Sequence, residues 1–255
     1  MSGFYSAIAH YYDAENMDKT DDIGLYLALA EKYGGPILEV GCGTGRVMIP
    51  LAQKGYEVHG VDSVQAMLDI AERYRSASPV LTTNMVLHHG DVLTYDLDKT
   101  FPLVLVPYNG LMHFRDQITQ IAVLERLRNW TAQGGLLVLD LPNAGDVFAT
   151  QETDAVMYER TFLEPRTGHM VMQQSVSYLD RVEQLLSVTW IYDEITGDGL
   201  VKRIIVPHVL YYYFYSELKL LLERTGFEVE AVYGDTENAP YEDGCERMIV
   251  FAKPL

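Results

Sequence analysis

The chain has 255 residues, of which 48% are hydrophobic, and this composition is enough to bury the core of one α/β domain. Its 36 acidic residues outnumber its 19 basic residues and give a formal net charge of −17. A protein that binds nucleic acid needs clustered basic residues to neutralise phosphates, and the sequence holds no Lys/Arg-rich run. Nucleic acid is therefore not expected as a substrate or a partner.

Three further features of the sequence narrow the class of protein. Residues 1–20 lack the basic and apolar regions of a signal peptide, and no apolar run approaches the ~20 residues that a membrane helix requires. The two cysteines, Cys42 and Cys245, make neither a disulfide framework nor a metal site. We therefore expect a cytoplasmic protein that uses no metal and no membrane, and the sequence leaves its oligomeric state open.

Strand and helix patterns alternate through the first 143 residues. This alternation suits right-handed βαβ crossovers and predicts a mostly parallel sheet with helices on both faces. Glycine pairs at 34–35 and 134–135 are expected to end two of the helices. The expected strands cover residues 37–40, 56–61, 85–89, 103–106 and 136–141, and the expected helices begin near residues 21, 44, 64 and 118.

The secondary-structure pattern of the sequence changes after residue 150. Residues 156–215 carry β-rich segments separated by turn signals, which predicts antiparallel hairpins inserted into the α/β scaffold. A last helix then opens at Ser216 and closes at Gly226, and two final strands, 227–233 and 247–252, are expected to pair at the sheet edge. We thus expect one domain made of an N-terminal lid segment (1–35), a core (36–145 and 215–255) and an inserted β region (150–214).

A glycine-rich turn follows the first strand directly. Glu39 lies in that strand, and Gly41-Cys42-Gly43-Thr44-Gly45 comes before the next helix. Glycines let the backbone approach a ligand closely, and the start of the helix supplies unpaired N–H groups. A dinucleotide site would need the spacing Gly-x-Gly-x-x-Gly, but Arg46 stands where its third glycine would be, and the Gly-Lys-Ser/Thr of a P-loop is absent. The spacing therefore indicates the turn that holds a nucleoside–methionine cofactor.

Two acidic residues follow the next two strands. Asp62 lies 17 residues beyond Gly45, where a carboxylate can accept hydrogen bonds from both ribose hydroxyls. Asp91 follows the third strand, where it can receive an adenine amino group beside the N–H of Val92. Simpler interpretations remain: Asp62 as a helix N-cap, Asp91 as a loop carboxylate, and the glycines as ordinary turn residues.

Together these motifs resemble the class I S-adenosylmethionine-dependent methyltransferases. The matching segments are Leu38 to Arg46, Val61-Asp62 with Met67-Leu68, Gly90-Asp91-Val92 and Gly134 to Asp140. The resemblance implies a Rossmann-like seven-stranded sheet whose last strand is antiparallel, with Glu39 near the methionine amino group and Asp62 on the ribose. The cofactor-binding residues that it implies are Glu39, Gly41, Cys42, Gly43, Gly45, Arg46, Asp62, Ser63, Met67, Asp91, Val92 and Tyr108.

A wider and less specific resemblance concerns the small-molecule N-methyltransferases of the glycine and amino-sugar types. It rests on the segment Tyr12-Asp13 near the N-terminus and on the inserted hairpins. Two positions depart from the family pattern: Val64 stands where Ser is frequent, and Pro102 replaces an Asp that often opens the fourth strand. Neither position carries an essential cofactor contact.

The acceptor is expected beyond the end of the fourth strand, because ligands of open α/β sheets bind at the carboxyl ends of the strands. The segment Pro107-Tyr108-Asn109-Gly110 differs from the Asn/Asp-Pro-Pro-Tyr of DNA and glutamine methyltransferases, which argues against amide and base-amine acceptors. His113 is the candidate general base, with a helix-capping or packing role as the alternative. Tyr11, with Tyr12, is expected to close over the cofactor, unless both only pack the N-terminal helix.

The aromatic run from Tyr211 to Tyr215 offers a further candidate. If it is a strand, alternate rings lie on opposite faces, and one face is expected either to wall the acceptor pocket or to be buried against the core. We expect methyl transfer from S-adenosyl-L-methionine to a nitrogen or oxygen of a small molecule. The alternatives are a nicotinamide oxidoreductase, an aminopropyltransferase, and a non-catalytic module that binds the cofactor.

Overall fold

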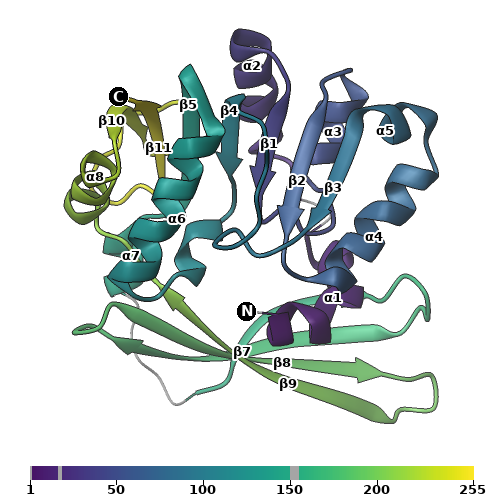
Figure 1. The fold of residues 1–255 in the computed structure, drawn as a ribbon. Helices are drawn as coiled ribbons and strands as arrows, with labels where there is room; N and C mark the ends of the chain where they lie inside the picture. Colours follow the sequence, from purple (N-terminus) through teal and green to yellow (C-terminus); the bar gives the residue numbers. More distant parts are fainter. Residues whose placement is uncertain (1, 17–18, 150–154) are drawn as a thin grey trace.

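The computed structural model describes residues 2–16, 19–149 and 155–255, and these residues form two sheets with helices around the larger one (Figure 1). The larger sheet has seven strands in the order β10-β11-β5-β4-β1-β2-β3, and β11 runs antiparallel to β5. The expected Rossmann-like sheet is therefore confirmed. Its strands are β1 (Ile37–Val40), β2 (Val58–Asp62), β3 (Met85–His89), β4 (Phe101–Val106), β5 (Thr131–Pro142), β10 (Phe227–Tyr233) and β11 (Arg247–Pro254).

Helices cover both faces of this sheet, and alternate residues of the central strands contact different helices. In β4, Leu103 and Leu105 pack with one set of helices, while Val104 and Val106 pack with the other. The first set is α2 (Ile23–Tyr33), α3 (Met48–Gln53), α4 (Gln65–Ser76) and α5 (Pro79–Asn84), and the second includes α6 (Gln117–Trp130) and α8 (Tyr215–Arg224).

The inserted region is a separate four-stranded antiparallel sheet, as expected. Its strands follow one another as β6 (Met157–Leu163), β7 (Met170–Asp180), β8 (Leu185–Ile195) and β9 (Val201–Tyr211). Helix α1 (Ser2–Asn16) lies between this sheet and α4 (Figure 1). Its Ile8 and Tyr11 pack with Val171 and Val206 of the inserted sheet, and its Ala9 packs with Met67 of α4.

Three expected boundaries are wrong. The helix expected from residue 44 begins at Met48, because residues 43–47 form turns around the glycines. Gly134 and Gly135 do not end α6 but lie inside β5, where a Cβ on Gly135 would come within 2.9 Å of two backbone oxygens. The aromatic run 211–215 is not a strand, since β9 ends at Tyr211 and α8 begins at Tyr215.

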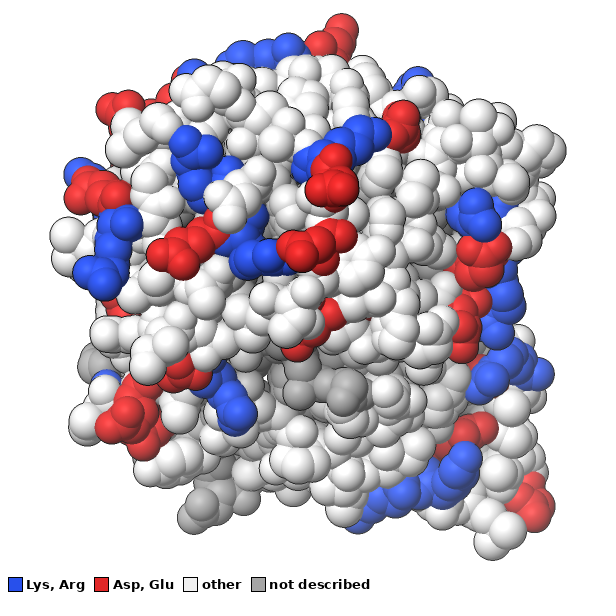
Figure 2. Space-filling view, in the orientation of Figure 1, with Lys and Arg blue, Asp and Glu red and all other residues white. Residues whose placement is uncertain are grey.

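The exposed surface mixes both signs of charge. On the face that Figure 2 shows, Lys and Arg side chains lie next to Asp and Glu and do not gather into a basic patch. Within the described ranges, every helix is too short or too polar to cross a membrane. A short 3-10 helix, η1 (Gly110–His113), and a short helix, α7 (Ala144–Ala149), complete the core.

Candidate active site

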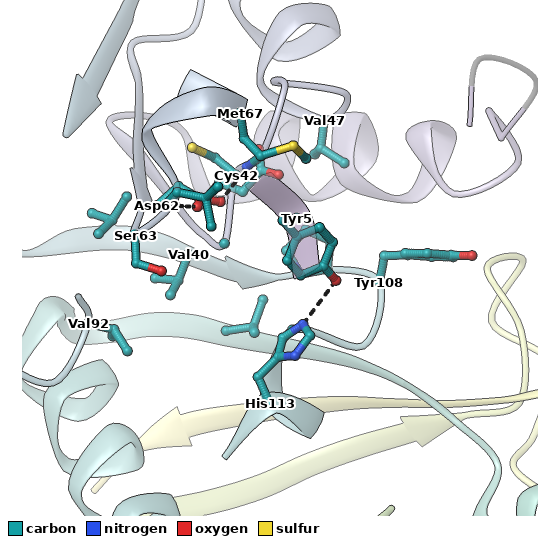
Figure 3. Close-up of a pocket in the computed structure, with 18 of the residues that line it drawn as sticks. Tyr5, Val40, Cys42, Val47, Asp62, Ser63, Met67, Val92, Tyr108 and His113 are labelled. Atoms are coloured by element: carbon teal, nitrogen blue, oxygen red, sulfur yellow. Dashed lines mark hydrogen bonds between the residues drawn. The ribbon is translucent and has the colours of Figure 1, made fainter. Parts of the chain in front are cut away.

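A cavity opens beyond the carboxyl ends of β1, β2, β3 and β4, where β1 and β4 lie side by side although β2 and β3 separate them in the sequence. Such a reversal of strand order is where open α/β sheets bind ligands. Residues from the core and from α1 line the cavity (Figure 3). Of the expected cofactor residues, these line it: Glu39, Gly41, Cys42, Gly43, Arg46, Asp62, Ser63, Met67, Asp91, Val92 and Tyr108.

The glycine turn is fixed by Asp62. Gly41 and Gly43 have φ values of 75° and 54°, which few residues other than glycine adopt. One oxygen of Asp62 accepts a hydrogen bond from the N–H of Gly43 and the other from the N–H of Val64, both at 2.8 Å. Burial raises the pKa of Asp62, and these two N–H groups oppose that shift. The carboxylate thus joins the first two motifs at the cavity wall.

Glu39 is the most deeply buried acid of the cavity. Its side chain is 2% exposed, and its Oε2 atom has no hydrogen-bond partner among the described residues. Burial raises the pKa of Glu39 to about 8, although the nearby guanidinium of Arg46 opposes this shift. A buried carboxyl with a free oxygen facing a cavity is suited to a cationic ligand, because a cation would restore the carboxylate.

Arg46 is held away from the turn by a bidentate ion pair. Its two terminal nitrogens donate to the two oxygens of Asp22 at 2.6 Å each, and one also donates to the carbonyl of Lys19. Tyr108 lies beside it with a left-handed backbone (φ 46°), and its ring faces the cations of Lys19, Arg46 and Arg247. In Figure 3 this ring points away from the rest of the cavity.

His113 lines the cavity, and its surroundings change its basicity. Its Nε2 is hydrogen-bonded to the hydroxyl of Tyr5 at 3.1 Å, and its Nδ1 is buried without a partner among the described residues (Figure 3). Burial, helped by the neighbouring His208, lowers the pKa of His113 to about 3. An imidazole with this pKa is a weak base at neutral pH, and the role of His113 as a general base stays a prediction.

Tyr11 was expected to close over the cofactor, but the structure places it elsewhere. It is fully buried against the inserted sheet, its hydroxyl donates to Glu194 at 2.9 Å, and its ring stacks on Tyr192. Tyr5 and Tyr12 line the cavity instead. Seven residues separate them, which is almost two helical turns, whereas Tyr11 points about 100° away from Tyr12. Helical spacing is the signal in the sequence that could have identified this pair.

The remaining expected site residues lie outside the cavity wall. The N–H of Gly45 donates to the carbonyl of Cys42, and Gly45 itself does not line the cavity. Asn109 is also absent from the wall, because its side chain accepts a hydrogen bond from Arg247. The aromatic run contributes no lining residue. Its Tyr213 instead donates to the carbonyls of Leu111 and Phe114 and so holds η1 in place.

Comparison with known proteins agrees with this geometry. A family profile described as "Methyltransferase domain" matches residues 37–135. The chain is similar to the cypemycin N-terminal methyltransferase of a Streptomyces species, with 25% identity over 85% of this chain and 82% of the relative. It is also similar to the dTDP-3-amino-3,6-dideoxy-alpha-D-glucopyranose N,N-dimethyltransferase of Streptomyces fradiae, with 31% identity over 52% of each chain.

Among solved structures, the CcbJ methyltransferase from Streptomyces caelestis superposes with a TM-score of 0.80 and 24% identity, over 95% of this chain and 96% of that one. This likeness shows that the two chains share a fold. None of the proteins named here is an oxidoreductase or a non-catalytic module. The profile match, the relatives and the fold agree with the motifs at the cavity, and the chain is an S-adenosylmethionine-dependent methyltransferase of class I.

Proposed function

We propose that this enzyme transfers the methyl group of S-adenosylmethionine to an amine nitrogen of a small molecule. The observation that carries the proposal is the arrangement of a single cavity. Glu39, Asp62 and Asp91 come from the ends of three adjacent strands, while Tyr5 and His113 enter from α1 and η1. The relatives support the choice of nitrogen, because their names describe methylation of a peptide N-terminus and of an amino sugar.

We assign the cofactor contacts from the chemistry of each wall residue. The free oxygen of Glu39 suits the ammonium of the methionine moiety, and Asp62 at the end of β2 suits the ribose hydroxyls. Asp91 lies exposed at the rim, where its Oδ1 accepts from the N–H of Leu93, and it is placed to meet the adenine edge together with Val92. Arg46, neutralised by Asp22, shapes the wall rather than binding a carboxylate.

The bound cofactor supplies an electrophilic methyl group on a sulfonium. The protein's own contribution is orientation and exclusion of water, since such a displacement needs the nucleophile in line with the bond that breaks. Tyr5 and Tyr12 close the cavity from α1, and Val106 and Phe114 form apolar parts of its wall. The weakly basic His113 is consistent with an acceptor that arrives already deprotonated.

Calorimetric titration tests the cofactor assignment. We expect micromolar binding of S-adenosylmethionine and S-adenosylhomocysteine and none of NADH. Asp62→Ala should weaken the binding by about hundredfold or more, because two charge-assisted hydrogen bonds of the turn are lost together with the ribose acceptor. Asp62→Asn serves as a second variant that keeps the shape of the side chain.

Asp96→Ala is the matched control, since Asp96 is an exposed acid paired with Arg126 outside the cavity. Binding of NADH alone, or of no nucleotide, would contradict the assignment. An acceptor screen by mass spectrometry then follows methyl incorporation into amino sugars, amino acids and peptide N-termini. Incorporation into hydroxyl groups only would overturn the choice of nitrogen.

A further inference from the structure

Four aromatic rings from three distant segments meet beside the cavity. Phe4 and Tyr5 belong to α1, His113 ends η1, and His208 lies in β9 of the inserted sheet. The ring of His208 stacks on Phe4 with 4.2 Å between centroids, and it lies 5.7 Å from Tyr5 and 5.1 Å from His113. The inserted sheet thereby reaches the side of the cavity that Tyr5 and His113 form.

This cluster contains two polar atoms with unsatisfied hydrogen-bonding capacity. Nδ1 of His113 and Nε2 of His208 are buried, and neither has a partner among the described residues. His208 as a whole is only 9% exposed. Buried polar side-chain atoms are nearly always paired in folded proteins, so two unpaired nitrogens in adjoining rings indicate a ligand that hydrogen-bonds there.

The cluster carries no net charge. Burial is the main cause that lowers the pKa of His113 to about 3 and that of His208 to about 4, so both rings are neutral at physiological pH. The nearby carboxylates are engaged elsewhere: Asp62 with the glycine turn, and Glu15 with Gln173 and Tyr192. Among the described residues, the titratable and charged groups that face the cluster are Tyr12 and Glu15 from α1, Asp62 from β2, Tyr108 after β4 and Arg115 after η1.

We propose that Tyr5, His113 and His208 form the acceptor subsite and that this subsite takes the reacting group as an uncharged primary or secondary amine. The inference rests on the proposed function. Each neutral imidazole has one nitrogen that accepts a hydrogen bond, and the Tyr5 oxygen also accepts, so the cluster can hold the N–H groups of an amine. An ammonium would find no free carboxylate among the described residues of this cluster, because Glu39 is assigned to the cofactor, and it would be costly to bury.

Holding the amine by its N–H groups leaves its lone pair free. The lone pair forms the new N–C bond while the S–C bond breaks, and the electron pair of that bond stays on sulfur as a neutral thioether. The methylated amine then carries one positive charge and retains its proton until it reaches water, because the two imidazoles are too weakly basic to keep it. The charged product is expelled from a subsite that favours neutral groups.

Nitrogen NMR tests the subsite without knowledge of the natural acceptor. Protein labelled with ¹⁵N-histidine and saturated with S-adenosylhomocysteine is titrated at pH 7 with aniline, which is uncharged, and with benzylamine, which is cationic. We expect millimolar aniline to shift the imidazole signals of His113 and His208, and benzylamine to shift them only at a pH high enough to deprotonate it. Equal shifts with benzylamine at pH 7, or no shift with either amine, would overturn the proposal.

Variants separate recognition of the amine from the integrity of the fold. His208→Phe keeps the stacking on Phe4 but removes the nitrogen, and it should weaken aniline binding about tenfold, the value of one hydrogen bond. His113→Phe should do the same, while His113→Gln, which keeps an acceptor, should restore part of the affinity. His169→Phe, in the connection between β6 and β7 and outside the cavity, is the control.

S-adenosylhomocysteine binding is measured in parallel by calorimetry. All four variants should bind it within about twofold of the unsubstituted protein, because we assign His113 and His208 to the acceptor subsite and because His169 lies outside the cavity. If the unsubstituted protein fails to bind S-adenosylhomocysteine, the proposed function is wrong. If it binds normally but the amines give no response, only the acceptor subsite is wrong.

Discussion

The two sides of the cavity are built in different ways. The cofactor side uses short segments (39–46, 61–67 and 90–92) that each follow a strand of one parallel sheet. The acceptor side uses Tyr5, His113 and His208, which belong to an N-terminal helix, a 3-10 turn and an inserted antiparallel strand. The cofactor side is therefore fixed by local backbone geometry, while the acceptor side depends on how three distant segments pack together.

The ion pairs of the core and of the inserted sheet differ in how far they are exposed to water. In the core, Asp140 is 2% exposed and is held by Arg247, by the hydroxyl of Tyr26 and by the N–H of Tyr108. In the inserted sheet, Asp193 pairs with Arg203, whose side chain is 55% exposed. The core pair therefore supports the backbone next to the active site, whereas in the other pair the carboxylate is buried and the guanidinium is exposed to water.

The largest expected effect comes from removing the cation of each pair. Arg247→Ala leaves a buried carboxylate without its ion partner and should lower the free energy of unfolding by about 3–5 kcal/mol. Arg203→Ala is the matched variant in the inserted sheet and should cost less, about 1 kcal/mol, because its guanidinium is largely exposed to water and Gln174 still donates to Asp193. Urea denaturation measures both, and equal losses would refute the contrast between the two regions.

An effect of similar size and opposite sign is expected at Glu39. Because burial raises its pKa to about 8, the folded chain keeps a proton that the unfolded chain releases at lower pH. Stability therefore falls as the pH rises from the ordinary glutamate range to about 8 and is level above it. Glu39→Gln lacks this loss and should be more stable at pH 8 by roughly 4–5 kcal/mol, relative to the difference at pH 4.

Glu39→Gln should also weaken the binding of S-adenosylmethionine. A glutamine cannot balance the ammonium of S-adenosylmethionine, so affinity should fall about tenfold or more in calorimetry. Thermal unfolding at both pH values, with and without the ligand, checks the two effects together. A variant that is no more stable than the original chain at pH 8 would show that Glu39 ionises freely.

The smallest effect is expected where α1 meets the inserted sheet. Tyr11→Phe removes the hydrogen bond to Glu194 and should destabilise the fold by about 1 kcal/mol, with unchanged affinity for S-adenosylmethionine. Tyr12→Ala, one position further along the same helix, removes a cavity wall and should weaken cofactor binding about tenfold. If Tyr11→Phe weakens binding as strongly, the two faces of α1 are not separated as we describe.

The sequence by itself determined the core and the cofactor side. Strands 37–40 and 85–89 were predicted at their observed bounds, and eleven of the twelve expected cofactor residues line one cavity, with Gly45 outside it. These residues could be placed together from the sequence because each motif lies within a short stretch of chain. Asp62, for example, ends β2 and accepts a hydrogen bond from the glycine turn that follows β1. Because β1 and β2 are paired in the sheet, the carboxylate and the turn lie next to each other.

Only the tertiary structure decided the acceptor side. No local pattern shows that His208 of β9 stacks on Phe4 of α1, or that His113 lies between α1 and the inserted sheet where its pKa falls. Likewise, the glycines at 134–135 and the aromatic run 211–215 have different roles once their neighbours are known. Burial and ring contacts between segments some hundred residues apart depend on docking of the whole chain, and desolvation, the cause of the altered histidine chemistry, exists only after that docking.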